Sequence, residues 1–205
     1  MSSCLARSMI LALLANTCVA LPQDSRTPGG IAVIPLPEYA PLTLEAYYGA
    51  ARVPVISERD SRTAIIGIPL SAQPGEAVLM LKAPDFSDSL SFGIHDKNYP
   101  EQHITLKDTS KVSPSAEDLA RYAREAAEQK AVYQRFSPGQ PDWPVFQMPI
   151  KGELSSPFGL KRFFNGEARD PHSGLDIAAP EGKTAYAPAD GMVVQTGDYF
   201  FNGRT

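Results

Sequence analysis

Short apolar runs separated by turn-forming residues constrain the fold of this chain more than any other feature of its sequence. The runs are five to eight residues long, and clusters rich in Gly, Pro, Asn or Asp separate them. Runs of this length are typical of β-strands, because helices need about ten residues or more. The sequence therefore predicts a small antiparallel β domain, a sandwich or barrel, over residues 28–108. The runs are residues 31–36, 52–56, 63–70, 77–82, 89–94 and 103–107.

Residues 113–136 follow a different pattern, in which apolar residues recur at helical spacing. Ser113 is the expected N-cap, Pro114 suits the first turn, and two acidic residues lie near the positive end of the helix dipole. The segment is predicted to be a linker helix that packs its apolar stripe on a neighbouring domain. The stripe consists of Leu119, Tyr122, Ala126, Tyr133 and Phe136.

Strand and turn patterns return over residues 141–205. Within them, residues 185–198 are expected to form two short strands around a Pro-Ala-Asp-Gly turn. About 60 residues are few for an independent core without disulfides or metal. The predicted fold class is therefore mainly β: an N-terminal antiparallel domain, one linker helix and an incomplete second antiparallel β domain.

The first twenty residues are typical of a secretory signal peptide cut after Ala20. Both cysteines, Cys4 and Cys18, lie inside this segment, so the mature chain would fold without disulfides. The alternative is a lipoprotein anchored through Cys18, but the residues preceding that cysteine do not match a lipobox. No other segment is long and apolar enough to span a membrane. We expect a periplasmic or extracellular protein.

The formal net charge of −4 gives no basic surplus, so we expect no nucleic-acid partner. The candidate metal-binding residues lie instead in "HSGLDIAA", where Asp176 follows His172 by four residues. Imidazole nitrogen and carboxylate oxygen both suit Zn²⁺. The residues alone leave two interpretations open, a metal-ligand pair and a structural hydrogen-bonded pair.

The surrounding motifs resemble the start of the M23 (LytM/lysostaphin-type) zinc metallopeptidase domain. The matching features, in order, are "SPFG" at 156–159, "HSGLD" at 172–176 and "APADG" at 187–191. The preceding part also resembles, more weakly, the β domain and helix that precede M23 domains in some exported proteins. That weaker resemblance rests on "AIIGIPL" and "YPEQHITL".

The resemblance implies a Zn²⁺ cofactor, with His172 and Asp176 matching the family's first two ligands. The family's third ligand and catalytic histidines come later, in part in an H-x-H element that this chain lacks. The other two histidines, His95 and His103, are expected in a turn and in a strand of the N-terminal region. We therefore expect the catalytic residues downstream of Thr205 and expect this chain to be inactive by itself.

The resemblance further implies a cell-wall hydrolase whose substrates are peptidoglycan stem peptides or cross-bridges. Arg162 and Asn165 lie where the family lines one wall of its groove, so they are candidate substrate or latency contacts, with structural turn roles as the alternative. A second hypothesis is a non-catalytic wall-binding or hydrolase-activating module. In a third, the N-terminal β domain contacts the peptidase groove and keeps the enzyme latent; a structural or wall-anchoring role for that domain is equally open.

Overall fold

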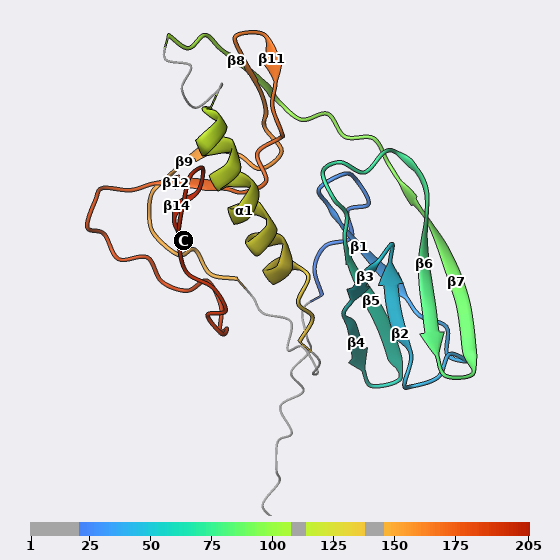
Figure 1. The fold of residues 1–205 in the computed structure, drawn as a ribbon. Coiled ribbons are helices and arrows are strands. Elements are labelled where there is room, and N and C mark those ends of the chain that lie inside the picture. The colour runs from blue at the N-terminus through green and yellow to red at the C-terminus, as the bar shows by residue number, and fades with distance from the viewer. Residues whose placement is uncertain (1–20, 108–113, 138–145) are drawn as a thin grey trace, which may run out of the picture.

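The computed structural model describes residues 21–107, 114–137 and 146–205, and it is mainly β with antiparallel sheets and one helix (Figure 1). The predicted signal peptide, residues 1–20, lies outside the described residues. No helix in the described part of the chain is long and apolar enough to cross a membrane.

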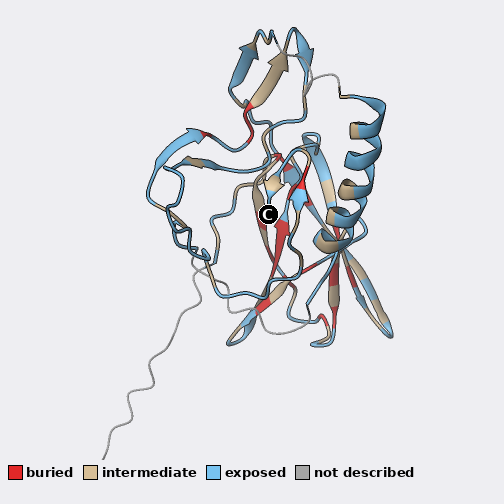
Figure 2. Cartoon of the chain, turned by 60° about the vertical axis from the view of Figure 1, so that its left-hand side comes forward, coloured by how far each residue is buried: buried red, intermediate tan, exposed pale blue. Residues whose placement is uncertain are grey.

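Two antiparallel sheets enclose the main hydrophobic core. Ala32 and Ile34 of one sheet meet Leu79, Leu81 and Phe92 of the other in a single buried cluster, so the N-terminal part is a sandwich (Figure 2). One sheet has the strand order β1 (Ile31–Pro35), β5 (Ser61–Gly67), β4 (Val55–Glu58). The other has the order β3 (Ala51–Val53), β2 (Glu45–Tyr48), β6 (Gly75–Ala83), β7 (Phe86–Ile94).

The chain passes between these sheets at Pro54, which separates β3 from β4. Proline has no backbone N–H for a ladder hydrogen bond, so the run at 52–56 divides into two strands in different sheets. Strand β2 was missing from the sequence prediction. It forms a hairpin with β3 across Gly49, whose positive φ of 59° suits a tight turn.

Strand β8 (Glu101–Ile104) does not join the N-terminal sheets. It pairs in parallel with β10 (Lys161–Phe164), and β11 (Glu167–Ala168) completes that sheet. The sequence predicted the run at 103–107 as a strand of the N-terminal antiparallel domain. A strand does form here, but its assignment to the N-terminal antiparallel sheets was wrong. Figure 1 shows the chain after β7 leaving the N-terminal sheets to reach β8 beside the β10–β11 hairpin.

The remaining C-terminal strands are short. β9 (Glu153–Ser156) pairs with β12 (Asp176–Ala178), and β13 (Asp198–Tyr199) pairs with β14 (Gly203–Arg204). The two strands expected within 185–198 do not form, because residues 185–197 contain no strand. Met192 and Val193 are 83% and 79% exposed there, so the apolar run has no sheet to pack against in the described residues.

The helix α1 (Ala116–Tyr133) forms where helical periodicity predicts it. Its N-cap is Ser115, whose hydroxyl accepts a hydrogen bond from the Asp118 N–H at 3.1 Å, and not the expected Ser113, which lies outside the described residues. None of its residues is buried (Figure 2). The predicted packing of its apolar stripe on neighbouring parts of the chain is therefore only partial: Tyr122 meets Phe201, and the Arg52 guanidinium lies 4.6 Å from the centre of the Phe136 ring.

Polar contacts instead attach α1 to the β13–β14 hairpin. Arg121 Nη2 donates to the Asp198 carbonyl at 2.9 Å, and the Phe200 N–H donates to Glu125 Oε2 at 2.8 Å. The Tyr122 ring meets Phe201 edge-on, with ring centroids 4.9 Å apart. The helix is thus held on this hairpin mainly by hydrogen bonds at its surface.

This attachment is expected to weaken in acid. The Phe200 N–H, together with the Arg121 guanidinium, keeps the pKa of Glu125 below its usual value, although desolvation opposes the shift. Because the folded pKa is lowered, the contribution is complete above the usual glutamic acid pKa of about 4.3 and is lost as pH falls through the lower folded value.

Amide hydrogen exchange of Phe200, measured by NMR between about pH 3 and pH 7, tests this expectation. In the parent chain the protection of this amide should fall in acid. In Glu125→Gln it should be lower at neutral pH and nearly independent of pH, whereas Glu128→Gln on the same helix should behave like the parent. Equal protection in Glu125→Gln and the parent at pH 7 would contradict the assigned contact.

Candidate metal site

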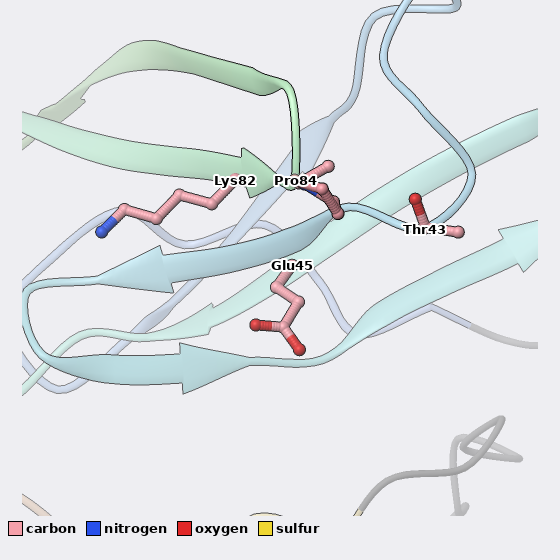
Figure 3. A pocket seen from close by; sticks show the side chains of 5 residues that line it. Thr43, Glu45, Lys82 and Pro84 are labelled. Carbon is pink, nitrogen blue, oxygen red and sulfur yellow. The ribbon is translucent and has the colours of Figure 1, made fainter.

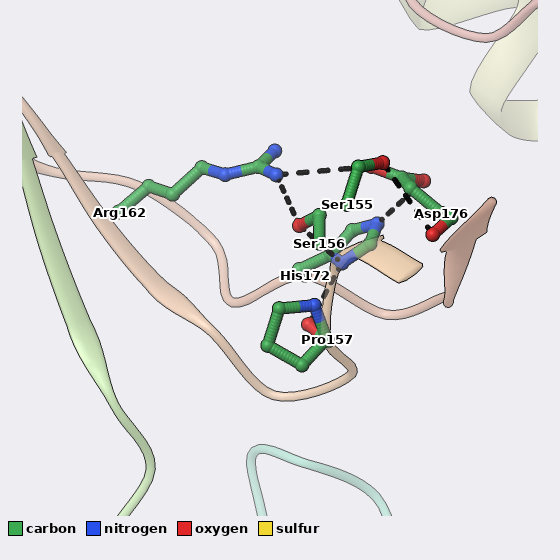
Figure 4. Close-up of polar contacts among 6 residues, drawn as sticks. All are labelled: Ser155, Ser156, Pro157, Arg162, His172 and Asp176. Carbon is green, nitrogen blue, oxygen red and sulfur yellow. Dashed lines mark hydrogen bonds and ion pairs between the residues drawn. The ribbon is translucent and has the colours of Figure 1, made fainter. Parts of the chain in front are cut away.

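The His172 ring is held in place by the loop that follows β9. Its Nδ1 atom lies 3.0 Å from the Pro157 carbonyl oxygen and 3.1 Å from Ser156 Oγ. The backbone of His172 is paired to the same loop, since its N–H donates to the Leu160 carbonyl at 3.0 Å and its carbonyl accepts from the Gly159 N–H at 2.7 Å. With 15% of its side chain exposed, the ring has one fixed orientation (Figure 4).

Asp176 enters the site at an irregularity in its strand. It opens β12 opposite Ser156 of β9, and the register shifts between Asp176 and Ile177. Such a bulge redirects a side chain and is common beside functional sites. Asp176 Oδ1 lies 3.2 Å from His172 Nε2, and 53% of the Asp176 side chain is exposed. The two side chains that the sequence singled out therefore converge at an open edge.

The hydrogen bonds of the imidazole determine what this edge can hold. A carbonyl oxygen only accepts, so the bond to Pro157 places a hydrogen on His172 Nδ1. The Nε2 atom then presents a lone pair to the Asp176 carboxylate unless a cation lies between them. That cation is either a second proton on the ring or a metal ion.

The distance itself fits both of the interpretations that the sequence left open. Two ligands bonded to a tetrahedral zinc ion at about 2.0–2.2 Å lie roughly 3.3–3.6 Å apart. The observed separation of 3.2 Å is close to this range, and it also suits a charged hydrogen bond between imidazolium and carboxylate. The backbone carbonyl behind the ring is the usual orienting partner of a metal-bound histidine.

Arg162 of β10 lies on the far side of the same cluster. Its Nη2 donates to Ser156 Oγ and lies 3.8 Å from Asp176 Oδ2 (Figure 4). Ser156 is only 5% exposed and was not singled out from the sequence, although it opens the Ser-Pro-Phe-Gly motif. Its hydroxyl lies between the Arg162 guanidinium and the His172 ring. Arg162 is therefore bonded within the site, and its predicted substrate contact stays a prediction.

Asn165 makes the contacts of a turn residue. It has a φ of 51° and precedes Gly166 at 85°, the geometry of an Asn-Gly hairpin turn between β10 and β11. Its N–H donates to the Ile104 carbonyl at 3.0 Å, and its Oδ1 accepts from the Leu106 N–H at 2.9 Å. The substrate-binding role predicted for Asn165 stays a prediction.

The other two histidines serve elsewhere. His103 lies in β8, stacks on Phe163 with centroids 4.4 Å apart and approaches Glu101 at 3.7 Å. The backbone N–H of His95 donates to the Arg26 carbonyl at 2.7 Å. Across the described ranges, no group of three His, Cys, Asp or Glu residues is placed to hold a metal ion. The described residues thus supply two donors to the candidate site.

A separate hollow lies in the N-terminal sandwich, at the ends of β2 and β6 (Figure 3). Its volume is about 400 Å³, and none of its lining residues belongs to the His172 cluster. The carboxylate of Glu45 within it is already bonded to the Tyr47 hydroxyl and Arg52, both at 2.6 Å. The lining residues are Thr43, Glu45, Lys82, Ala83 and Pro84.

Removing the buried hydroxyl should loosen the site. Ser156→Ala leaves the Arg162 guanidinium without this acceptor, so the free energy of unfolding is expected to fall by about 1 kcal/mol. The neighbouring exposed Ser155 makes a weak contact at 3.5 Å, so Ser155→Ala should cost less than about 0.5 kcal/mol. Urea denaturation measures both. Equal effects of the two substitutions would show that the Ser156 bonds contribute nothing specific.

A model of the N-terminal domain of peptidase family M23 matches residues 24–97. A crystal structure of a candidate M23 peptidase from Pseudomonas aeruginosa superimposes with a TM-score of 0.68 at 38% identity, covering 88% of this chain and 67% of that one. No curated protein matches the chain. With this identity over most of both chains, the protein belongs to peptidase family M23.

Proposed function

We propose that this family M23 protein is an exported zinc metalloendopeptidase of peptidoglycan, and that the present chain contributes two zinc ligands, His172 and Asp176. The observation that carries the proposal is the 3.2 Å approach of His172 Nε2 to Asp176 Oδ1, with Nδ1 fixed on the Pro157 carbonyl. A lone pair and a carboxylate brought together in this way form half of a cation site.

The two donors present, an imidazole nitrogen and a carboxylate oxygen, are both ligands that zinc accepts. Bound zinc would lower the pKa of a coordinated water and polarise a peptide carbonyl. His172 would supply its Nε2 lone pair in a fixed tautomer, and half-exposed Asp176 would supply a carboxylate oxygen from the open edge. Arg162 would balance the Asp176 charge from the opposite side, at 3.8 Å.

Two ligands do not complete a catalytic zinc site, which needs three protein ligands and an open position for water. The sequence has three histidines, and among the described residues neither His95 nor His103 joins a group of three possible metal ligands. We therefore propose that this chain alone binds zinc weakly and does not hydrolyse peptides. A complete site would also need a third protein ligand and catalytic histidines, which the described residues do not supply.

Export is proposed from the apolar segment that precedes Ala20, which is typical of a cleaved signal peptide. The compartment would be periplasmic or extracellular, where peptidoglycan stem peptides and cross-bridges are accessible substrates. The lipoprotein alternative through Cys18 would place the same domains at a membrane surface.

Calorimetric titration with Zn²⁺ tests the metal site. His172→Ala and Asp176→Ala should each weaken zinc binding by about tenfold or more, because each removes one of two ligands. His103→Ala is the matched control: it deletes an exposed imidazole that also lies near a carboxylate, Glu101, but has no such backbone support. Zinc affinity that survives His172→Ala and is lost in His103→Ala would place the metal elsewhere.

Incubation with purified peptidoglycan separates the enzymatic proposal from its alternative. The zinc-loaded 205-residue chain should release no peptides, as judged by chromatography of the soluble fraction. Release of peptides would contradict the proposed inactivity. Sedimentation with insoluble peptidoglycan that is unchanged by a chelator and by His172→Ala would favour a non-catalytic wall-binding module over a peptidase.

A further inference from the structure

The loop that holds His172 is packed on its other side by the segment leaving the N-terminal sandwich. Tyr99, between β7 and β8, meets Phe158 edge-on with ring centroids 6.3 Å apart. Phe158 and Gly159 follow directly after Pro157, whose carbonyl holds the His172 ring. One aromatic ring thus lies directly behind the backbone of the candidate metal site.

Gly159 allows this close approach. A Cβ atom at position 159 would lie 2.0 Å from Tyr99 Cε1, well inside any real contact distance, and the φ of 82° also suits glycine. The N–H of this residue donates to the His172 carbonyl at 2.7 Å. The ring of Tyr99 therefore touches the residue that fixes the His172 backbone.

The sandwich in turn fixes the Tyr99 ring. The Tyr99 hydroxyl donates to the carbonyl of buried Pro28 at 2.8 Å. A Cβ atom at Gly29 would lie 2.7 Å from the Tyr99 hydroxyl and 2.7 Å from Phe158, so these groups fill the space completely. The hydroxyl end of the ring is therefore held by Pro28 and Gly29 of the N-terminal domain.

Strand β8 continues the same contact along the chain. Directly after Tyr99, the Pro100 carbonyl accepts from the Lys161 N–H at 2.9 Å, and β8 then pairs with β10. The register places Gln102 beside Arg162, the residue that contacts Ser156 and Asp176. Residues 99–104 thus contact both the loop at 157–159, which holds His172, and strand β10, which carries Arg162.

We infer that Tyr99 is a positioning residue for His172 and acts through Gly159. Through Tyr99, the N-terminal domain supports the backbone of the candidate metal site. The link to zinc rests on the proposed function, whereas the link to the His172 backbone does not. Ordering contacts behind a metal ligand commonly change metal affinity by about 10- to 100-fold.

Amide hydrogen exchange and Co²⁺ titration of the 205-residue chain test this inference. In Tyr99→Ala, the amides of Gly159 and His172 should exchange at least about tenfold faster, and Co²⁺ affinity, followed by visible absorption, should fall by about tenfold. Tyr99→Phe keeps the ring against Gly159 but loses the hydroxyl bond to Pro28, so it should restore most of both properties. Tyr48→Ala is the matched control, because Tyr48 packs on Phe92 inside the sandwich with centroids 5.8 Å apart.

Unchanged exchange at Gly159 and His172 in Tyr99→Ala, or the same acceleration in Tyr48→Ala, would overturn the inference. Exchange decides the matter even if the parent chain binds no Co²⁺, an outcome that would count against the proposed function alone. Should Tyr99→Ala fail to fold, Tyr99→Leu takes its place with the same readouts and the same criteria.

A double-mutant cycle provides an independent check. Gly159→Ala should disturb the two amides strongly because its Cβ collides with the ring. Combining it with Tyr99→Ala removes the collision, so the double variant should show less than the sum of the two single effects. Strict additivity would mean that Tyr99 and Gly159 act separately and would also overturn the inference.

Discussion

The bond between His172 Nδ1 and the Pro157 carbonyl is the contact on which the rest of the site depends. It fixes the tautomer, and so turns the Nε2 lone pair toward the Asp176 carboxylate. Two electron-rich groups at 3.2 Å need a cation between them, either a second ring proton or a metal ion. The proposal of a metal site to which this chain contributes two ligands follows from this arrangement.

The residues around His172 and Asp176 differ in how far they are exposed to solvent. Ser156 is buried and joins Arg162 to the imidazole, whereas Asp176 is half exposed at the start of a bulged strand. The supporting contacts are thus shielded from water, and the ligand edge stays accessible. The Asp176 carboxylate is accessible at that edge, and the Arg162 guanidinium lies 3.8 Å from it.

The two halves of the chain differ in how they are stabilised. The N-terminal sandwich has an apolar core contributed by both sheets, while the described C-terminal residues bury only Ser156, Gly159, Leu160 and Tyr199. Hydrogen bonds from β8, the support of Tyr99 and the contacts of α1 take the place of a core there. Because residues of the preceding part support its loop and strand, the candidate site depends on both halves of the chain.

The sequence by itself determined the mainly β class, the helix, the family resemblance and the pair His172 and Asp176, because periodicity and motif spacing are local properties. It misplaced the N-cap, omitted β2, assigned the run at 103–107 to the wrong sheet and predicted strands within 185–198. Strand pairing and side-chain burial depend on residues distant in the chain. Only the tertiary structure therefore revealed Ser156 between Arg162 and His172, and Tyr99 behind Gly159.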